Sequence, residues 1–164
     1  MPTLRTVSHL VDDFNLFQGQ NRLLAVVSPT CPGCQETARL VTDALVAHPS
    51  APVLALFLWM GILPDDNPTE AHAQAGLLGP ERRLRHYWEG EGWSVSSALR
   101  PVLGIGDLDP ARSAWDVCLH FPAGVRWEDE PPIPEGWVCN TRYDPGGDSF
   151  GRISAGLLGR WLDG

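Results

Sequence analysis

Hydrophobic residues recur every three or four positions along the first seventeen residues of the chain. The series consists of Leu4, Val7, Leu10 or Val11, Phe14 and Phe17. This spacing places apolar side chains on one face of an α-helix. The pattern therefore predicts an amphipathic helix over residues 4–17, ended by Gly19.

Two continuous apolar runs follow, LLAVV at 23–27 and VLALFLW at 53–59. Runs of this length without polar positions are typical of strands that are buried on both faces. Between them, Ala38, Val41 and Leu45 share one face of a predicted helix that Pro49 ends. A strand, a helix and a strand in this order predict a parallel crossover unit.

The rest of the chain alternates between helical and strand patterns. We predict a helix over 69–78, an extra strand in 82–88 and a short helix in 96–104. A strand over 115–121, a turn at 122–124 and a return strand over 125–128 follow, with an acidic loop to residue 135. The last predicted helix carries Phe150, Ile153, Leu157 and Trp161 on one face. The predicted fold class is therefore α/β, with a central mixed sheet flanked by helices.

Length and charge restrict the function. A chain of 164 residues indicates one domain, spanning residues 1–164. Its net charge is −8, and the 12 residues counted as lysine or arginine are all arginine. A net negative surface argues against nucleic acid and anionic membranes as partners. Asp12 and Asp13 interrupt any signal-peptide core, and no apolar run approaches the ~18 residues of a membrane span, so we expect a cytoplasmic protein.

Cys31 and Cys34 are the candidate reactive residues, because CPGC stands between a buried strand and a helix. This places Cys31 at the N-cap and Pro32 at the first helical position, where proline is favoured. The unpaired N–H groups and the helix dipole stabilise negative charge there, so the pKa of Cys31 should fall. Cys34, one turn on, lies within reach to close a disulfide with Cys31.

The order of these elements around Cys31-Pro32-Gly33-Cys34 resembles the thioredoxin-like superfamily over most of the chain. The resemblance implies a thioredoxin-like fold with an insertion before the C-terminal hairpin. It also implies a thiol–disulfide oxidoreductase, with Cys31 as nucleophile and Cys34 as resolving cysteine. Its partners would be a protein or small-molecule disulfide and an electron donor, with no cofactor and no metal.

Two positions depart from the family pattern. Where relatives carry a cis-proline before the hairpin strand, this chain has Ala114, Trp115 and Asp116, and the buried acid of thioredoxins falls near Ala25. We expect Trp115 and Asp116, with Pro32, to face the substrate. Trp115 alternatively fills the core. Asp116 alternatively bonds the backbone or assists proton transfer to Cys34.

Other interpretations of the cysteines stay open. Cys31 and Cys34 alternatively pack as structural cysteines, or bind copper(I) or another thiophilic ion with His86 or His120 as an added ligand. A four-cysteine zinc site would need Cys118 and Cys139, which stand 21 residues apart. Cys118 in a predicted strand favours simple packing, and His86 favours a structural role.

A peroxiredoxin-like thiol peroxidase is a further alternative. Enzymes of that kind resemble this fold and carry a hydroxyl residue three positions before their reactive cysteine, with an arginine nearby. Ser28 has this spacing to Cys31, and Arg126 or Arg142 would supply the arginine.

Overall fold

The computed structural model describes residues 2–90, 94–104, 114–139 and 153–163. These residues form eleven elements: β1 (Leu4–Thr6), α1 (Ser8–Leu16), β2 (Asn21–Val27), α2 (Pro32–Ala47), β3 (Val53–Met60), α3 (Pro68–Leu77), β4 (Leu84–Glu89), α4 (Ser94–Val102), β5 (Val117–Phe121), β6 (Gly136–Cys139) and α5 (Ala155–Asp163). None of the described helices is both long and apolar enough to cross a lipid bilayer.

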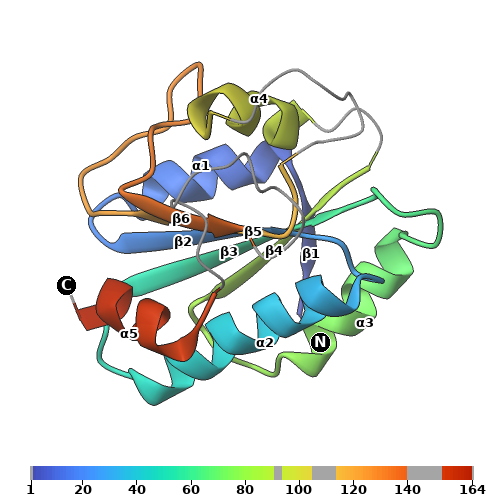
Figure 1. Cartoon of the computed structure of the whole chain (residues 1–164), viewed down its shortest axis with the longest axis horizontal. Coiled ribbons are helices and arrows are strands. Elements are labelled where there is room, and N and C mark those ends of the chain that lie inside the picture. Colours follow the sequence, from blue (N-terminus) through green and yellow to red (C-terminus); the bar gives the residue numbers. More distant parts are fainter. Residues whose placement is uncertain (1, 91–93, 105–113, 140–152, 164) are drawn as a thin grey trace.

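The strands form one mixed sheet in the order β1-β4-β3-β2-β5-β6. Strands β1, β4, β3 and β2 are parallel, whereas β5 runs antiparallel to β2 and β6 antiparallel to β5. Helices α1 and α4 cover one face, and α2, α3 and α5 cover the other (Figure 1). This is the central mixed sheet flanked by helices that the sequence predicts, with β4 and α4 in the predicted insertion.

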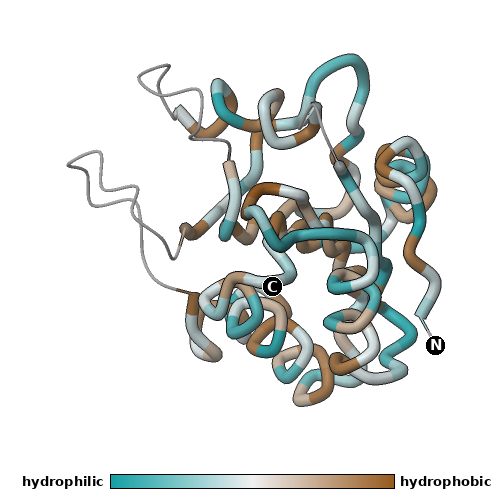
Figure 2. The backbone as a smooth tube through the Cα atoms, turned by 90° about the vertical axis from the view of Figure 1, so that its right-hand side faces the viewer, coloured by the Kyte–Doolittle hydropathy of each residue, from teal (hydrophilic) through white to brown (hydrophobic). Residues whose placement is uncertain are grey.

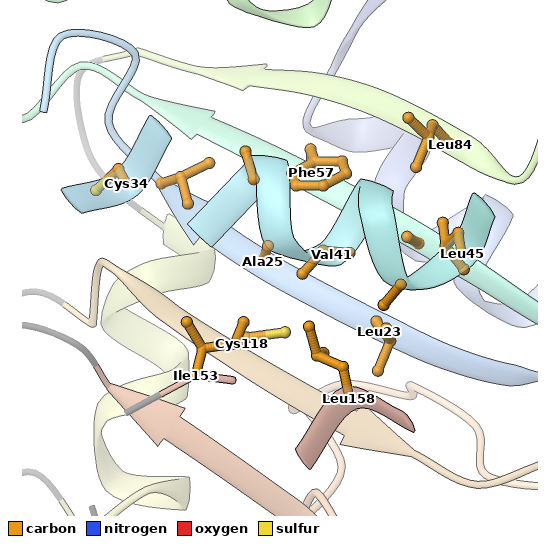
Figure 3. Packing of buried hydrophobic residues seen from close by; sticks show 14 of the residues in the cluster. Leu23, Ala25, Cys34, Val41, Leu45, Phe57, Leu84, Cys118, Ile153 and Leu158 are labelled. Carbon is orange, nitrogen blue, oxygen red and sulfur yellow. The ribbon is translucent and has the colours of Figure 1, made fainter. Parts of the chain in front are cut away.

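Each face of the sheet buries its own hydrophobic cluster. Strand β3 is buried at all eight positions, as a strand packed on both sides must be. Its alternate residues divide between the two clusters, so Phe57 packs toward α2 and Leu56 toward α1 and α4. Hydrophobic segments accordingly gather along the strands in the middle of the molecule (Figure 2), and Val41 and Leu45 of α2 lie over this core in Figure 3.

The helix predicted over residues 4–17 is present only in its later part. A helix is present, but Leu4–Thr6 forms strand β1 and pairs in parallel with β4. A few apolar residues at mixed spacing fit either element, and here the exposed edge of β4 supplies hydrogen-bond partners that a sequence pattern cannot reveal.

The predicted return strand over 125–128 is also wrong, because side chains outside the hairpin bind the backbone of this segment. Arg22 donates to the carbonyls of Pro122 and Val125 at 2.6 and 2.8 Å. Asn15 accepts from the Trp127 N–H at 2.9 Å and donates to its carbonyl at 2.7 Å. The segment therefore forms no ladder with β5, and β6 at Gly136–Cys139 takes that place.

The last helix begins later than its sequence pattern suggests. It starts at Ala155, and its buried residues are Leu158 and Leu162, whereas Leu157 and Trp161 are only partly buried. Ile153 is buried ahead of the helix, and Phe150 lies outside the described residues.

Candidate functional site

Several loops meet at one edge of the sheet because their strands are parallel or antiparallel neighbours. The chain leaves β2 and β3 at this edge, since the two strands are parallel. Strand β5 is antiparallel to β2 and pairs Val117 with Val26, so β5 begins where β2 ends. The CPGC segment after β2 therefore lies beside the residues that precede β5.

Cys31 occupies the N-cap of α2 in an extended backbone conformation, with φ −85° and ψ 119°. Pro32 is at the first helical position, as the sequence predicts. Cys31 is 8% exposed and Cys34 is fully buried. Figure 3 shows Cys34 at the start of α2 and Cys118 on β5, within the same hydrophobic cluster.

Asp116 completes a compact group with the two cysteines. The sulfurs of Cys31 and Cys34 and a carboxylate oxygen of Asp116 all lie within 4.8 Å of one another. Asp116 is buried and has a positive φ of 53°, a conformation that aspartate tolerates better than most residues. The Thr37 hydroxyl donates to its Oδ1 at 2.9 Å, from one turn beyond Cys34 on α2.

The surroundings of Cys31 favour its thiolate. A hydrogen bond from the Cys34 side chain, with backbone N–H groups of Cys34 and Gly33, lowers the pKa of Cys31 to about 6. Burial and the negative charge of Asp116 oppose this shift. The hydrogen bond from Cys34 is the largest of these effects, and the first turn of the helix adds N–H groups that have no intrahelical partners.

The thiols of Cys34 and Cys118 are held in the protonated form. Burial is the main cause that raises the pKa of Cys34, followed by its hydrogen bond with Cys31 and the charge of Asp116. Burial alone raises the pKa of Cys118 to about 12. One sulfur of the CPGC pair is thus poised as a thiolate and the other as a proton donor beside it.

Trp115 lies between the hydrophobic core and the molecular surface. Its side chain is partly buried and packs against both hydrophobic clusters, and its carbonyl lies 3.9 Å from the Cys139 sulfur, which donates to it. These contacts are consistent with its role as a core residue. They also leave part of its surface open at the edge that carries the CPGC segment.

The candidate extra metal ligands lie elsewhere. His86, on β4, is buried and stacks on the aromatic rings of Phe57 and Trp59, and it accepts a hydrogen bond from the indole N–H of Trp59 at 3.3 Å. His120 stacks on Trp161 of α5 and lies 3.2 Å from Glu135. Among the described residues, no group of three metal-ligating side chains includes either histidine, Cys118 or Cys139.

The residues proposed for a peroxidase have other partners. The Ser28 hydroxyl donates to Asp66 at 2.9 Å. Arg126 binds Gln18, which precedes β2, and the seven residues of β2 separate this position from the CPGC edge by about 20 Å. Arg142 lies outside the described residues.

Two site residues were not identified from the sequence. Thr37 stands three positions after Cys34, so a helix through CPGC places it on the same face, and this spacing is a usable signal. Asp66 lies 35 residues after Cys31, and nothing in the local sequence links it to the cysteines.

Comparisons with known proteins find similarity in structure but not in sequence. No protein-family model and no curated protein matches the chain. Similar solved structures include MTB DsbF in mixed oxidized and reduced forms, with 16% identity and a TM-score of 0.49 over 93% of this chain and 83% of that one. Another is a secreted Mycobacterium tuberculosis disulfide oxidoreductase homologous to E. coli DsbE, with 13% identity and a TM-score of 0.49 over 90% and 84%.

Proposed function

We propose that the protein is a thiol–disulfide oxidoreductase that uses Cys31 as nucleophile and Cys34 as resolving cysteine. The observation that carries the proposal is the position of Cys31 at the N-cap of α2, with its pKa lowered to about 6 beside a protonated Cys34. A thiolate with an adjacent thiol has what disulfide exchange requires.

The reaction proceeds in two exchanges. The Cys31 thiolate attacks one sulfur of a substrate disulfide, which forms a mixed disulfide and releases the other substrate sulfur as a thiolate. Cys34 then loses its proton and attacks the Cys31 sulfur, which frees the second substrate thiolate and leaves a Cys31–Cys34 disulfide. The substrate gains two electrons, and a dithiol donor returns the protein to its reduced form.

Asp116 and Trp115 supply the surroundings of this chemistry. The Asp116 carboxylate lies within 4.8 Å of the Cys34 sulfur, so it accepts the Cys34 proton when the second exchange begins. Trp115, directly before it in the chain, offers an apolar surface for the substrate chain, and the exposed Pro32 offers a second one. The substrate is a protein or small-molecule disulfide, and the working compartment is the cytoplasm, where thiols stay reduced.

Trapping of the mixed disulfide tests the proposal. Cys34→Ser should accumulate a covalent adduct with oxidised glutathione on Cys31, visible as a mass increase that dithiothreitol removes, because the resolving thiol is absent. Cys31→Ser is the matched control and should accumulate no such adduct on Cys34. A Cys34→Ser protein that stays unmodified would reject the nucleophile assignment.

A second candidate function is the binding of a thiophilic ion such as copper(I), favoured by the clustering of Cys31, Cys34 and Asp116. Elemental analysis of the purified protein beside a count of its free thiols separates the two functions. Bound metal with reduced thiols supports the binding protein. A metal-free protein that cycles between dithiol and disulfide supports the oxidoreductase.

A further inference from the structure

Asp66, in the loop between β3 and α3, accepts five hydrogen bonds through one carboxylate. Its Oδ1 accepts from the Ser28 hydroxyl at 2.9 Å, the Thr30 N–H at 3.1 Å and the Thr30 hydroxyl at 2.6 Å. Its Oδ2 accepts from the N–H groups of Ile62 and Leu63 at 3.0 and 2.8 Å. One side chain thus joins its own loop to the segment that leads into Cys31.

This segment needs an external contact because Cys31 is an unusual helix cap. No side-chain hydrogen bond caps α2 at Cys31, whereas Asn67 at the start of α3 caps its helix by accepting from two N–H groups. Serine, threonine, aspartate and asparagine normally fix the entry of a helix in this way. In α2 the corresponding constraint comes from Asp66, which binds both groups of Thr30, the residue directly before Cys31.

We propose that Asp66 is a positioning residue that holds the Cys31 sulfur against the N–H groups at the start of α2. This inference rests on the proposed role of Cys31 and deepens it. Three of the five hydrogen bonds cross between loops whose residues are 36 to 38 positions apart. Their loss would free the backbone before Cys31 and weaken the contacts of its sulfur with the Gly33 and Cys34 N–H groups.

The charge of Asp66 and its hydrogen bonds make opposite predictions. A carboxylate near a thiolate disfavours the thiolate by repulsion, so its neutralisation alone would lower the Cys31 pKa. Loss of positioning would raise it, because the thiolate would lose donors. The direction in which the Cys31 pKa changes in Asp66→Asn therefore distinguishes the two roles. A purely structural contact would leave the Cys31 pKa unchanged.

The test measures the rate of Cys31 alkylation by iodoacetamide against pH, with peptide mapping to assign the modified cysteine. In Asp66→Asn an amide nitrogen replaces one acceptor oxygen, so at least two of the five donors lose their partner. We expect the midpoint of the rate profile to rise by about one pH unit, which lowers the rate at pH 6 roughly fivefold. Asp65→Asn, which neutralises the exposed adjacent carboxylate, is the matched control and should keep the wild-type midpoint.

Thr30→Val provides a second variant that keeps the Asp66 charge and removes one hydrogen bond of 2.6 Å. We expect a smaller rise of the same sign, and this variant decides the test if thermal unfolding shows that Asp66→Asn does not fold. An unchanged or lowered midpoint in the folded variants overturns the proposal. An ordinary midpoint near 8.5 in the wild type would instead overturn the proposed function of Cys31.

Discussion

Cys31 and Cys118 belong to one hydrophobic cluster and are both buried, yet their thiols behave in opposite ways. The pKa of Cys31 is lowered to about 6, and the pKa of Cys118 is raised to about 12. Cys118 lies in the middle of the sheet, paired with Ala25 on one side and Val138 on the other, so the ladder uses the neighbouring backbone groups. Cys31 lies where a helix begins, and backbone donors remain for its sulfur.

The comparison shows that burial suppresses the charged form of a side chain unless partners stabilise it, which are donors for an anion and acceptors for a cation. His86 follows the same rule as Cys118, since burial is the largest cause that lowers its pKa to about 4. Its Nδ1 accepts from Trp59, which fits a neutral ring. Burial thus keeps Cys118 and His86 neutral, whereas the start of α2 stabilises the Cys31 thiolate.

The largest expected effect is a difference in reaction rate between variants of Cys31 and Cys118. Cys31→Ser should slow the reaction of the reduced protein with oxidised glutathione at pH 7 at least about a hundredfold, because a thiol with a pKa near 9 is only about 1% thiolate there. Cys118→Ala should react at nearly the wild-type rate. Acid-quenched mass spectrometry measures both rates, and a large loss in Cys118→Ala would break the comparison.

His86 should make stability depend on pH. Its pKa is lowered in the folded state, so the unfolded chain binds the proton first, and stability present above pH 6.5 is lost as the pH falls toward 4. Between pH 7 and pH 5 the loss should be about 2 kcal/mol. Urea unfolding of the wild type and His86→Gln measures it.

The difference between these two proteins in free energy of unfolding should shrink as the pH falls, because glutamine does not titrate. His9→Gln, at an exposed position on α1, controls for the loss of one imidazole. A constant difference between the wild type and His86→Gln from pH 7 to pH 5 would show that the buried histidine binds its proton as easily as in the unfolded chain.

A smaller effect should come from Asp116, whose charge opposes the Cys31 thiolate. Asp116→Asn should lower the Cys31 pKa by about half a pH unit, since it removes the nearby negative charge. Asparagine also tolerates the positive φ and can accept the Thr37 hydrogen bond, so the fold should persist. Asp12→Asn, on α1 at the other face of the sheet, is the control, and a raised pKa in Asp116→Asn would refute the repulsion.

The parts of the site that depend on short-range order could be predicted from the sequence. CPGC between an apolar run and a helical pattern was sufficient to place Cys31 at the N-cap and Pro32 after it. The position of Asp116 followed from the expected pairing of VCLHF beside the strand that ends before the motif. Both inferences use the regular geometry of strands and helices.

The parts that depend on side chains from distant segments could not be predicted. Asp66 reaches Thr30 across 36 residues, and no periodic pattern records such a contact. The segment after β5 has apolar residues that favour a strand, but Arg22 and Asn15 bind its backbone instead. A buried arginine in β2 gave no sign in the sequence that its partners would be carbonyls of a loop.

Ultraviolet titration of the reduced protein tests the central contrast most directly. Thiolate absorbance near 240 nm, followed from pH 4 to pH 9, should show one cysteine titrating with a pKa of about 6, and Cys31→Ser should lose this step. Cys118 should contribute no thiolate over this range, because burial raises its pKa to about 12. A profile in which no cysteine titrates below the ~8.5 of a free thiol would contradict the account.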